Sequence, residues 1–180
     1  MQLLKIPAAA NNNKYSFLLP VKKSQQSLQR TILIRAIRSD LEVLKLVCQS
    51  LPSALEVVST HRPLSSFWTV TLLEYIQQSR QIADGELTTL YSSIRATLRN
   101  KTSKDAQYAA RMVFVVLAQK MALGDKLLAS LMVAMLKTVD DGKTTDSEAD
   151  QVLLTVFAII DAQGVQVAQE DYAKRILSIS

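Results

Sequence analysis

The chain is poor in the residues that build metal sites, disulfides and tight turns. Its 180 residues include one cysteine, one histidine, four glycines and four prolines. A single cysteine, Cys48, excludes an internal disulfide and a cysteine-based zinc site, and favours a reducing, intracellular setting. Cys48 lies at an apolar helical position, where we expect a buried and unreactive thiol. The single histidine, His61, excludes a pair of histidine ligands and is expected in a surface loop.

Patterns of known catalytic and ligand-binding sites are also missing. No uncharged apolar run approaches the ~20 residues that span a bilayer. Gly142-Lys143-Thr144 lacks the upstream glycine of a phosphate-binding loop. The acidic residues between Asp140 and Asp150 do not have the spacing of an EF-hand. We therefore predict a non-enzymatic protein with no cofactor, no metal, no small-molecule substrate and no membrane partner.

What the chain does contain is a helical repeat. Hydrophobic residues make up 48% and aromatic residues 6% of the sequence, which with few turn residues favours an all-α fold. Gly85, Gly124 and Gly164 are almost evenly spaced, each between two apolar runs of helical spacing. Because glycine suits a left-handed residue after a helix, we expect each to end one. The predicted starts of three long helices repeat at a similar interval, near Ser65, Lys104 and Thr145.

The interval between these markers is a period of about 40 residues with two helices, which is typical of HEAT and armadillo repeats. The predicted fold is an α-solenoid of stacked antiparallel helical hairpins with about four repeats. Residues 1–63 are expected to form an irregular N-terminal segment and a divergent first repeat. Residues 64–180 are expected to form three regular helix pairs, at 64–100, 104–138 and 146–179. We expect the chain to be a fragment of a much longer solenoid.

Local signals predict the helices of the first region. One helix is expected from about Ser27 to Arg38, with a second capped by Ser39 or Asp40. Pro52 is expected to begin a short third helix, because proline suits the first helical turn.

Helix faces and caps are predicted further along. The face of the next helix that is expected to meet the core consists of Phe67, Val70, Leu73 together with Leu72, and Ile76. Trp68 is expected to be a packing anchor, and the helix to end near Gly85. Thr145 and Glu148 have the spacing of a capping box, and a last helix is expected at about 167–179.

Charge is distributed unevenly along a chain whose net charge is +5. Residues 1–63 hold nine Lys/Arg against three Asp/Glu, residues 86–137 eight against three, and residues 138–180 three against eight. This asymmetry suits a polyanion at one end and a basic partner at the other, although a solvated surface would look the same. The candidate RNA or partner residues are Lys22, Lys23, Arg30, Arg35, Arg38, Arg99, Lys101 and Lys104. Aromatic residues are scarce near them, so an RNA contact would be made to the phosphate backbone.

Two stretches near the start resemble a known family. They are Gln2-Leu3-Leu4-Lys5-Ile6, and Phe17-Leu18-Leu19-Pro20-Val21-Lys22 followed by Leu28-x-x-Thr31-Ile32-Leu33-Ile34. These stretches are similar to the N-terminal region of the family of U three small nucleolar RNA-associated protein ten, also called HEAT repeat-containing protein one. A weaker similarity continues through Asp40-Leu41 and Tyr108-Ala109-Ala110. Asp105-Ala106-Gln107-Tyr108-Ala109 departs from the Asp and Val-Arg pattern of many HEAT repeats.

The resemblance implies a scaffold in ribosome biogenesis, as a HEAT-repeat subunit of the small-subunit processome in the nucleolus. Family members act early in making 18S ribosomal RNA, in a transcription-linked subcomplex with β-propeller proteins. They bind near the 5′ external transcribed spacer of the precursor RNA. The alternative is a transport or adaptor solenoid of the importin or armadillo type. Such a protein binds basic peptides through an acidic groove, whereas residues 86–137 are basic.

Overall fold

The computed structural model describes residue 18 and residues 28–57, 61–139 and 144–164. None of these residues is in a strand, and the all-α prediction is confirmed for them. Lys22, Lys23, the predicted helix start near Ser27 and the predicted helix at 167–179 lie outside the described residues. The seven α-helices of the described part are α2 (Arg30–Ser39), α3 (Leu41–Leu55), α4 (Arg62–Gln78), α5 (Asp84–Arg99), α6 (Lys104–Lys120), α7 (Asp125–Leu136) and α8 (Asp146–Gln163).

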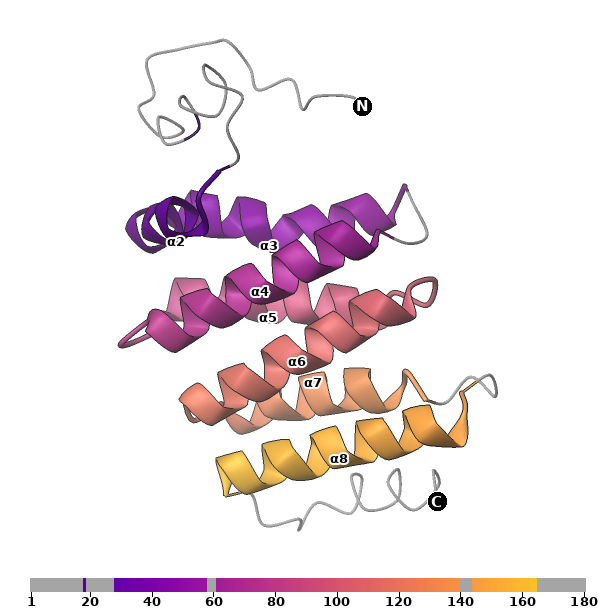
Figure 1. The fold of residues 1–180 in the computed structure, drawn as a ribbon. Coiled ribbons are helices and arrows are strands. Elements are labelled where there is room, and N and C mark those ends of the chain that lie inside the picture. The colour runs from indigo at the N-terminus through magenta and orange to yellow at the C-terminus, as the bar shows by residue number, and fades with distance from the viewer. Residues whose placement is uncertain (1–17, 19–27, 58–60, 140–143, 165–180) are drawn as a thin grey trace.

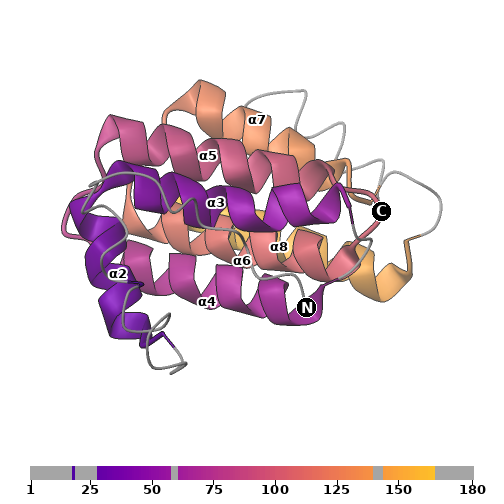
Figure 2. The ribbon, with the colours of Figure 1, turned by 90° about the horizontal axis from the view of Figure 1, so that it is seen from above.

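The helices pack in two layers. One layer consists of α4, α6 and α8 and the other of α3, α5 and α7, while α2 lies across one end of α3 and α4 (Figures 1 and 2). Contacts across the layers join α3 to α4, α5 to α6, and α7 to α8. The helices α4, α6 and α8 begin at Arg62, Lys104 and Asp146, at equal intervals close to the predicted period. This arrangement is consistent with an α-solenoid, and the assignment of residues to repeats stays a prediction.

Only one of the three evenly spaced glycines has the predicted conformation. Gly164 ends α8 in the left-handed region, with φ 59°. Gly85 instead lies in the first turn of α5, and Gly124 is the extended residue that precedes α7. The helix before Gly85 ends at Gln78, where the Ser79 hydroxyl donates to the Tyr75 carbonyl oxygen at 2.7 Å. The period of the glycines was therefore informative, but their predicted role as helix ends was wrong at two of three positions.

Pro52 does not begin a helix, as predicted, but lies inside α3. A proline has no N–H, so the carbonyl four residues earlier loses its helical donor. That carbonyl belongs to Cys48, and it accepts hydrogen bonds from the Trp68 indole N–H at 3.1 Å and from the Ser93 hydroxyl. The donors come from α4 and α5, so the proline creates an acceptor that ties α3 to both neighbouring helices.

The Cys48 carbonyl gives a test of this arrangement. We expect Ser93→Ala to lower the free energy of unfolding by about 1 kcal/mol, because the carbonyl loses one of its two donors. With Pro52→Ala a backbone N–H is restored beneath that carbonyl, so Ser93→Ala should then cost about half as much. Urea unfolding of the four chains measures this coupling, with exposed Ser92→Ala as the control. If Ser93→Ala lowers the free energy of unfolding equally with and without Pro52→Ala, the Cys48 carbonyl does not depend on the Ser93 donor in the way described.

The buried face of α4 agrees with the predicted one only in part. Phe67 and Val70 are 43% and 38% exposed, while Trp68 and Leu72 are fully buried. The buried face also holds hydroxyl residues such as Thr69. Its hydroxyl donates a hydrogen bond to the Ser65 carbonyl oxygen within the same helix, at 2.7 Å. The hydrophobic pattern was therefore right at Leu72 and Ile76, which are fully buried, and wrong at Phe67 and Val70. The prediction for Trp68 is confirmed.

Two predicted helix caps are confirmed. The Asp40 carboxylate accepts the Glu42 backbone N–H at 2.8 Å at the start of α3. At the start of α8 the Thr145 hydroxyl accepts the Glu148 N–H at 3.3 Å, and the Glu148 carboxylate accepts the Thr145 N–H at 3.1 Å. None of the described helices has the length and apolar character needed to cross a membrane.

Candidate nucleic-acid interface

A basic pocket of about 390 Å³ lies between α5 and α7, beside the loop that joins α5 to α6. Four of its described lining residues are Lys or Arg and none is Asp or Glu. The pocket is lined by Arg95, Leu98, Arg99, Lys101, Gln107, Ala129, Ser130, Val133, Ala134, Lys137 and Thr138.

Arg95 is held in this pocket by a neighbouring aromatic ring. Its guanidinium carbon lies 5.9 Å from the centre of the Tyr91 ring, and the Tyr91 hydroxyl donates to the Ser130 hydroxyl at 2.9 Å. The Nε of Arg95 is buried and has no hydrogen-bond partner in the described part of the chain. Buried polar groups in folded proteins nearly always have a partner, so this nitrogen is suited to an acceptor that is brought to the pocket.

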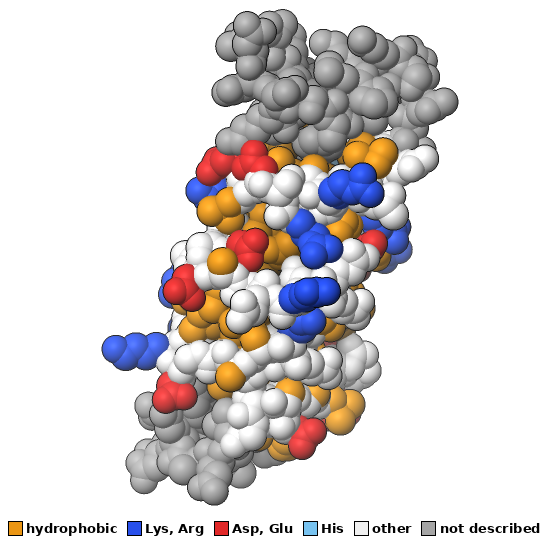
Figure 3. Space-filling view, turned by 90° about the vertical axis from the view of Figure 1, so that its left-hand side faces the viewer, with side chains coloured by type: hydrophobic (Ala, Val, Ile, Leu, Met, Phe, Trp, Pro, Cys, Tyr) orange, Lys and Arg blue, Asp and Glu red, His pale blue; other side chains and the backbone are white. Residues whose placement is uncertain are grey.

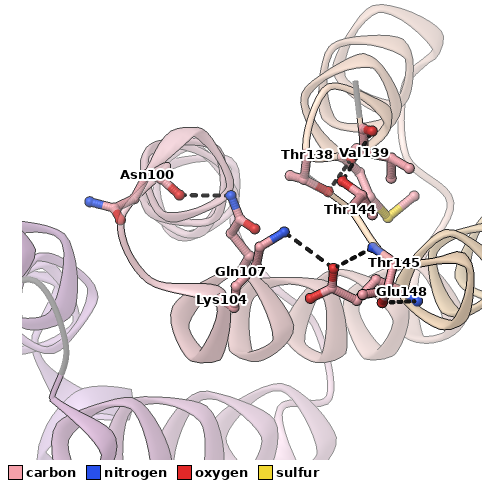
Figure 4. A network of polar contacts seen from close by, with 9 residues as sticks. Asn100, Lys104, Gln107, Thr138, Val139, Thr144, Thr145 and Glu148 are labelled. Atoms are coloured by element: carbon pink, nitrogen blue, oxygen red, sulfur yellow. Dashed lines mark hydrogen bonds and ion pairs between the residues drawn. The ribbon is translucent and has the colours of Figure 1, made fainter. Parts of the chain in front are cut away.

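The loop from α5 to α6 is fixed by Asn100. Its side-chain oxygen accepts the backbone N–H groups of Thr102 and Ser103, each at 3.0 Å. Its backbone carbonyl accepts from the Gln107 side chain at 2.7 Å (Figure 4). These bonds set the course of the loop that carries Lys101 to the edge of the pocket.

The four cations of the pocket are not neutralised from within the described part of the chain. Arg95, Arg99, Lys101 and Lys137 form no ion pair with any described residue. Like charges gathered in one concave site raise the local concentration of anions. The site can therefore bind an anion or several phosphates of a polyanion.

The structure separates the predicted basic residues into two groups. Arg99 and Lys101 line the basic pocket, whereas Arg35 and Arg38 line a different hollow with Glu74 of α4. The α2 residues lie at one end of the helices and the α5–α6 loop lies at the other (Figures 1 and 2). The described candidates thus do not share one pocket, and Lys22 and Lys23 lie outside the described residues.

Two further candidates are engaged by carboxylates. The Lys104 ammonium lies 3.5 Å from the Glu148 carboxylate of α8 (Figure 4). The Nε of Arg30 lies 3.8 Å from a carboxylate oxygen of Glu74. At the α2 end, Lys and Arg gather in a band with Asp and Glu beside them (Figure 3). This mixture of signs makes the α2 end a weaker polyanion site than the basic pocket.

Sequence reasoning missed Arg95 and Lys137. Arg95 is four residues before Arg99, so the two share one helix face, and this signal was available. Lys137 lies one period after Arg95, the same interval that separates the starts of α4, α6 and α8. The two residues therefore occupy equivalent positions in the successive repeats that this period predicts. That α5 and α7 bring these positions together could be learned only from their packing.

Comparison with known families bears on the same part of the chain. The family model of U3 small nucleolar RNA-associated protein 10 matches residues 86–180, which is more than half of the sequence. The chain belongs to this family. All described residues of the basic pocket fall within the matched range, and the α2 arginines fall outside it. Searches among curated proteins and among solved structures return no significant match.

The family assignment agrees with the resemblance found in the sequence, on different residues. The motifs quoted for the resemblance lie mainly before Asp40, whereas the family model matches from Glu86 onward. The family assignment therefore rests on the helices that carry the basic pocket.

The single cysteine and the single histidine have structural surroundings in this chain. Burial raises the pKa of Cys48 to about 12, which leaves its thiol protonated and unreactive. His61 is exposed, and its Nδ1 accepts the Leu64 backbone N–H at 3.1 Å at the start of α4. The described part of the chain contains no group of His, Cys, Asp and Glu side chains that could hold a metal ion.

Glu148 should make stability depend on pH. The pKa of Glu148 is lowered mainly because its carboxylate accepts the Thr145 N–H. Partial burial raises this pKa, and the nearby Lys104 ammonium lowers it. Such a carboxylate stabilises the fold above the unfolded pKa of about 4.3, and this stabilisation is lost as the pH falls through the folded pKa. We expect Glu148→Gln to have a lower Tm than the parent at about pH 7, with the difference vanishing in acid.

Thermal unfolding of both chains between about pH 7 and pH 3 measures this difference. Asp150→Gln, on an exposed residue of the same helix, is the control. A difference in Tm that stays constant over the whole range would contradict the assigned role of the carboxylate.

Proposed function

We propose that this chain is part of a non-enzymatic HEAT-type α-solenoid scaffold of the small-subunit processome, and that its basic pocket binds the phosphate backbone of precursor rRNA. One observation carries the RNA half of the proposal. Four cations that form no ion pair with any described residue line one pocket, within the range that matches the family of a small nucleolar RNA-associated protein.

The scaffold half rests on architecture and family. Layered helices, of which α4, α6 and α8 begin at equal intervals along the chain, provide long surfaces for partners. The family suggests a role in ribosome biogenesis. Within that role we propose nucleolar localisation, early 18S precursor processing linked to transcription, and β-propeller processome subunits as protein partners.

The proposed RNA contact is to the backbone and not to bases. No described lining residue of the pocket is aromatic, so bases have no ring to stack on. Arg and Lys recognise phosphate oxygens regardless of sequence. The 5′ external transcribed spacer would then be selected by position within the particle and not by base reading. The sign of the pocket also disfavours the importin-type alternative, whose ligand is a basic peptide.

RNA affinity measured over a salt series tests this function. Each phosphate contact to a single strand contributes about −0.7 to the slope of log K against log salt, so four contacts predict a slope of about −3. We expect similar affinities for oligonucleotides of different sequence, and no binding of a lysine-rich peptide. An affinity that is absent at low salt, or insensitive to added salt, would refute the RNA proposal.

A further inference from the structure

A second surface feature lies on the opposite layer, where α4, α6 and α8 face outward. It is an apolar groove of about 450 Å³ between α6 and α8 that also reaches α4. The groove is lined by Leu73, Tyr108, Arg111, Met112, Val115, Val116, Gln151, Leu154 and Thr155.

Large apolar side chains are exposed along this groove. Met112 and Leu154 are 54% and 68% exposed, and exposed Phe157 follows Leu154 by one helical turn. Met112 also lines a neighbouring hollow together with exposed Val70 of α4, so the apolar surface continues across three helices. Contiguous apolar surface of this kind marks a site of interaction more often than a bare exterior.

Arg111 lies in the groove as a buried cation that no described carboxylate pairs with directly. It is 5% exposed, and its guanidinium carbon lies 4.2 Å from the centre of the Tyr108 ring. Its Nε is buried without a hydrogen-bond partner, and Arg111 forms no ion pair with any described residue. Glu148 attracts the Arg111 charge, but its carboxylate is already bonded to the Thr145 N–H and to Lys104. A cation in this setting is costly until an acceptor reaches it.

We propose that this groove is a docking site for a segment of a partner protein in which one carboxylate side chain is flanked by apolar side chains. The carboxylate accepts hydrogen bonds from the Arg111 guanidinium, and the flanking side chains cover Met112 and Leu154. A planar guanidinium matches a carboxylate with two parallel bonds, which supplies specificity in an otherwise apolar groove. RNA is not the expected occupant, because one cation among apolar residues offers a polyanion far less than the basic pocket.

Binding of paired peptides tests the proposal. The probes are short labelled peptides with one aspartate or glutamate between leucine, phenylalanine or methionine residues, each with an asparagine or glutamine twin. We expect the intact chain to bind acidic peptides at least about tenfold more tightly than their amide twins, which is the effect of a hydrogen bond to a charged group. In Arg111→Gln that preference should disappear.

Two further variants separate the groove from the rest of the surface. Leu154→Ser should weaken both members of a peptide pair, because it removes apolar contact area. Leu46→Ser, which changes a leucine 51% exposed on α3, should weaken neither. If circular dichroism shows that Arg111→Gln is unfolded, two measurements still test the proposal. They are the affinities of the acidic and amide peptides for the parent chain, and the effect of Leu154→Ser on both.

Several outcomes would overturn the proposal. They are equal affinity for the acidic and amide peptides, no binding up to about 1 mM, and self-association of the chain that Arg111→Gln abolishes. A loss of RNA binding in Arg111→Gln with peptide binding intact would also overturn it, since the groove would then belong to the nucleic-acid site.

Discussion

Trp68→Ala is expected to lower the free energy of unfolding by about 3–5 kcal/mol, the range for removing a large buried aromatic side chain. Trp68 is fully buried among α3, α4 and the rest of the core, and it is the only tryptophan of the chain. Its indole N–H also donates at 3.1 Å to the carbonyl that Pro52 leaves without a helical donor. The variant therefore loses packing and leaves a buried acceptor with fewer partners.

Urea unfolding followed by far-ultraviolet circular dichroism measures this loss, because the variant has no tryptophan fluorescence. Phe67→Ala is the matched control, since it removes an aromatic ring from the adjacent residue on the exposed side of α4. We expect the control to cost less than about 1 kcal/mol. Equal losses from the two variants would show that α4 presents a different face to the core.

Removal of four charges from the basic pocket is expected to weaken RNA binding by more than about 100-fold at low salt. The variant carries Arg95→Gln, Arg99→Gln, Lys101→Gln and Lys137→Gln. Each lost phosphate contact removes about 0.7 from the salt slope, so the slope should fall from about −3 to near zero. The helices should remain folded, because none of the four side chains forms an ion pair within the described residues.

A control variant with the same loss of net charge separates the pocket from general electrostatics. It changes four exposed cations toward the α2 end to glutamine, namely Arg35, Arg38, Arg80 and Lys126. When both variants are compared at about 0.15 M salt, the Debye length is about 8 Å and screens the cations of the α2 end from RNA in the pocket, so we expect an affinity loss of less than about fivefold for the control. If the control variant weakens binding as much as the pocket variant, or more, the RNA site is not the basic pocket.

The repeat period was predictable from the sequence because each helix must present an apolar stripe to the same neighbours. The starts of α6 and α8 came out within a residue of their predicted places. Pro52 was not predictable, because the donors that satisfy the Cys48 carbonyl are 20 and 45 residues further along the chain. A prediction from the residues near Pro52 cannot include hydrogen-bond donors that lie so far away in the sequence.

The candidate site was predictable only in part. Arg99 and Lys101 were found as a local cluster, and the structure places both in the basic pocket. Arg95 and Lys137 join them only because α5 packs beside α7. Lys104 was included for its position, but its side chain points across to Glu148. Sequence neighbours thus show where charge is concentrated, and the packing of layers decides which charges share a pocket.

The most direct test of the central claim is photo-cross-linking from the pocket within the native processome particle. A photoreactive amino acid at Ala129, a small residue of the pocket lining that forms no side-chain bond, would report what lies in the pocket. The account predicts cross-links to precursor rRNA at Ala129, and few to RNA from a matched probe at Arg80. Cross-links from Ala129 to protein alone would contradict it.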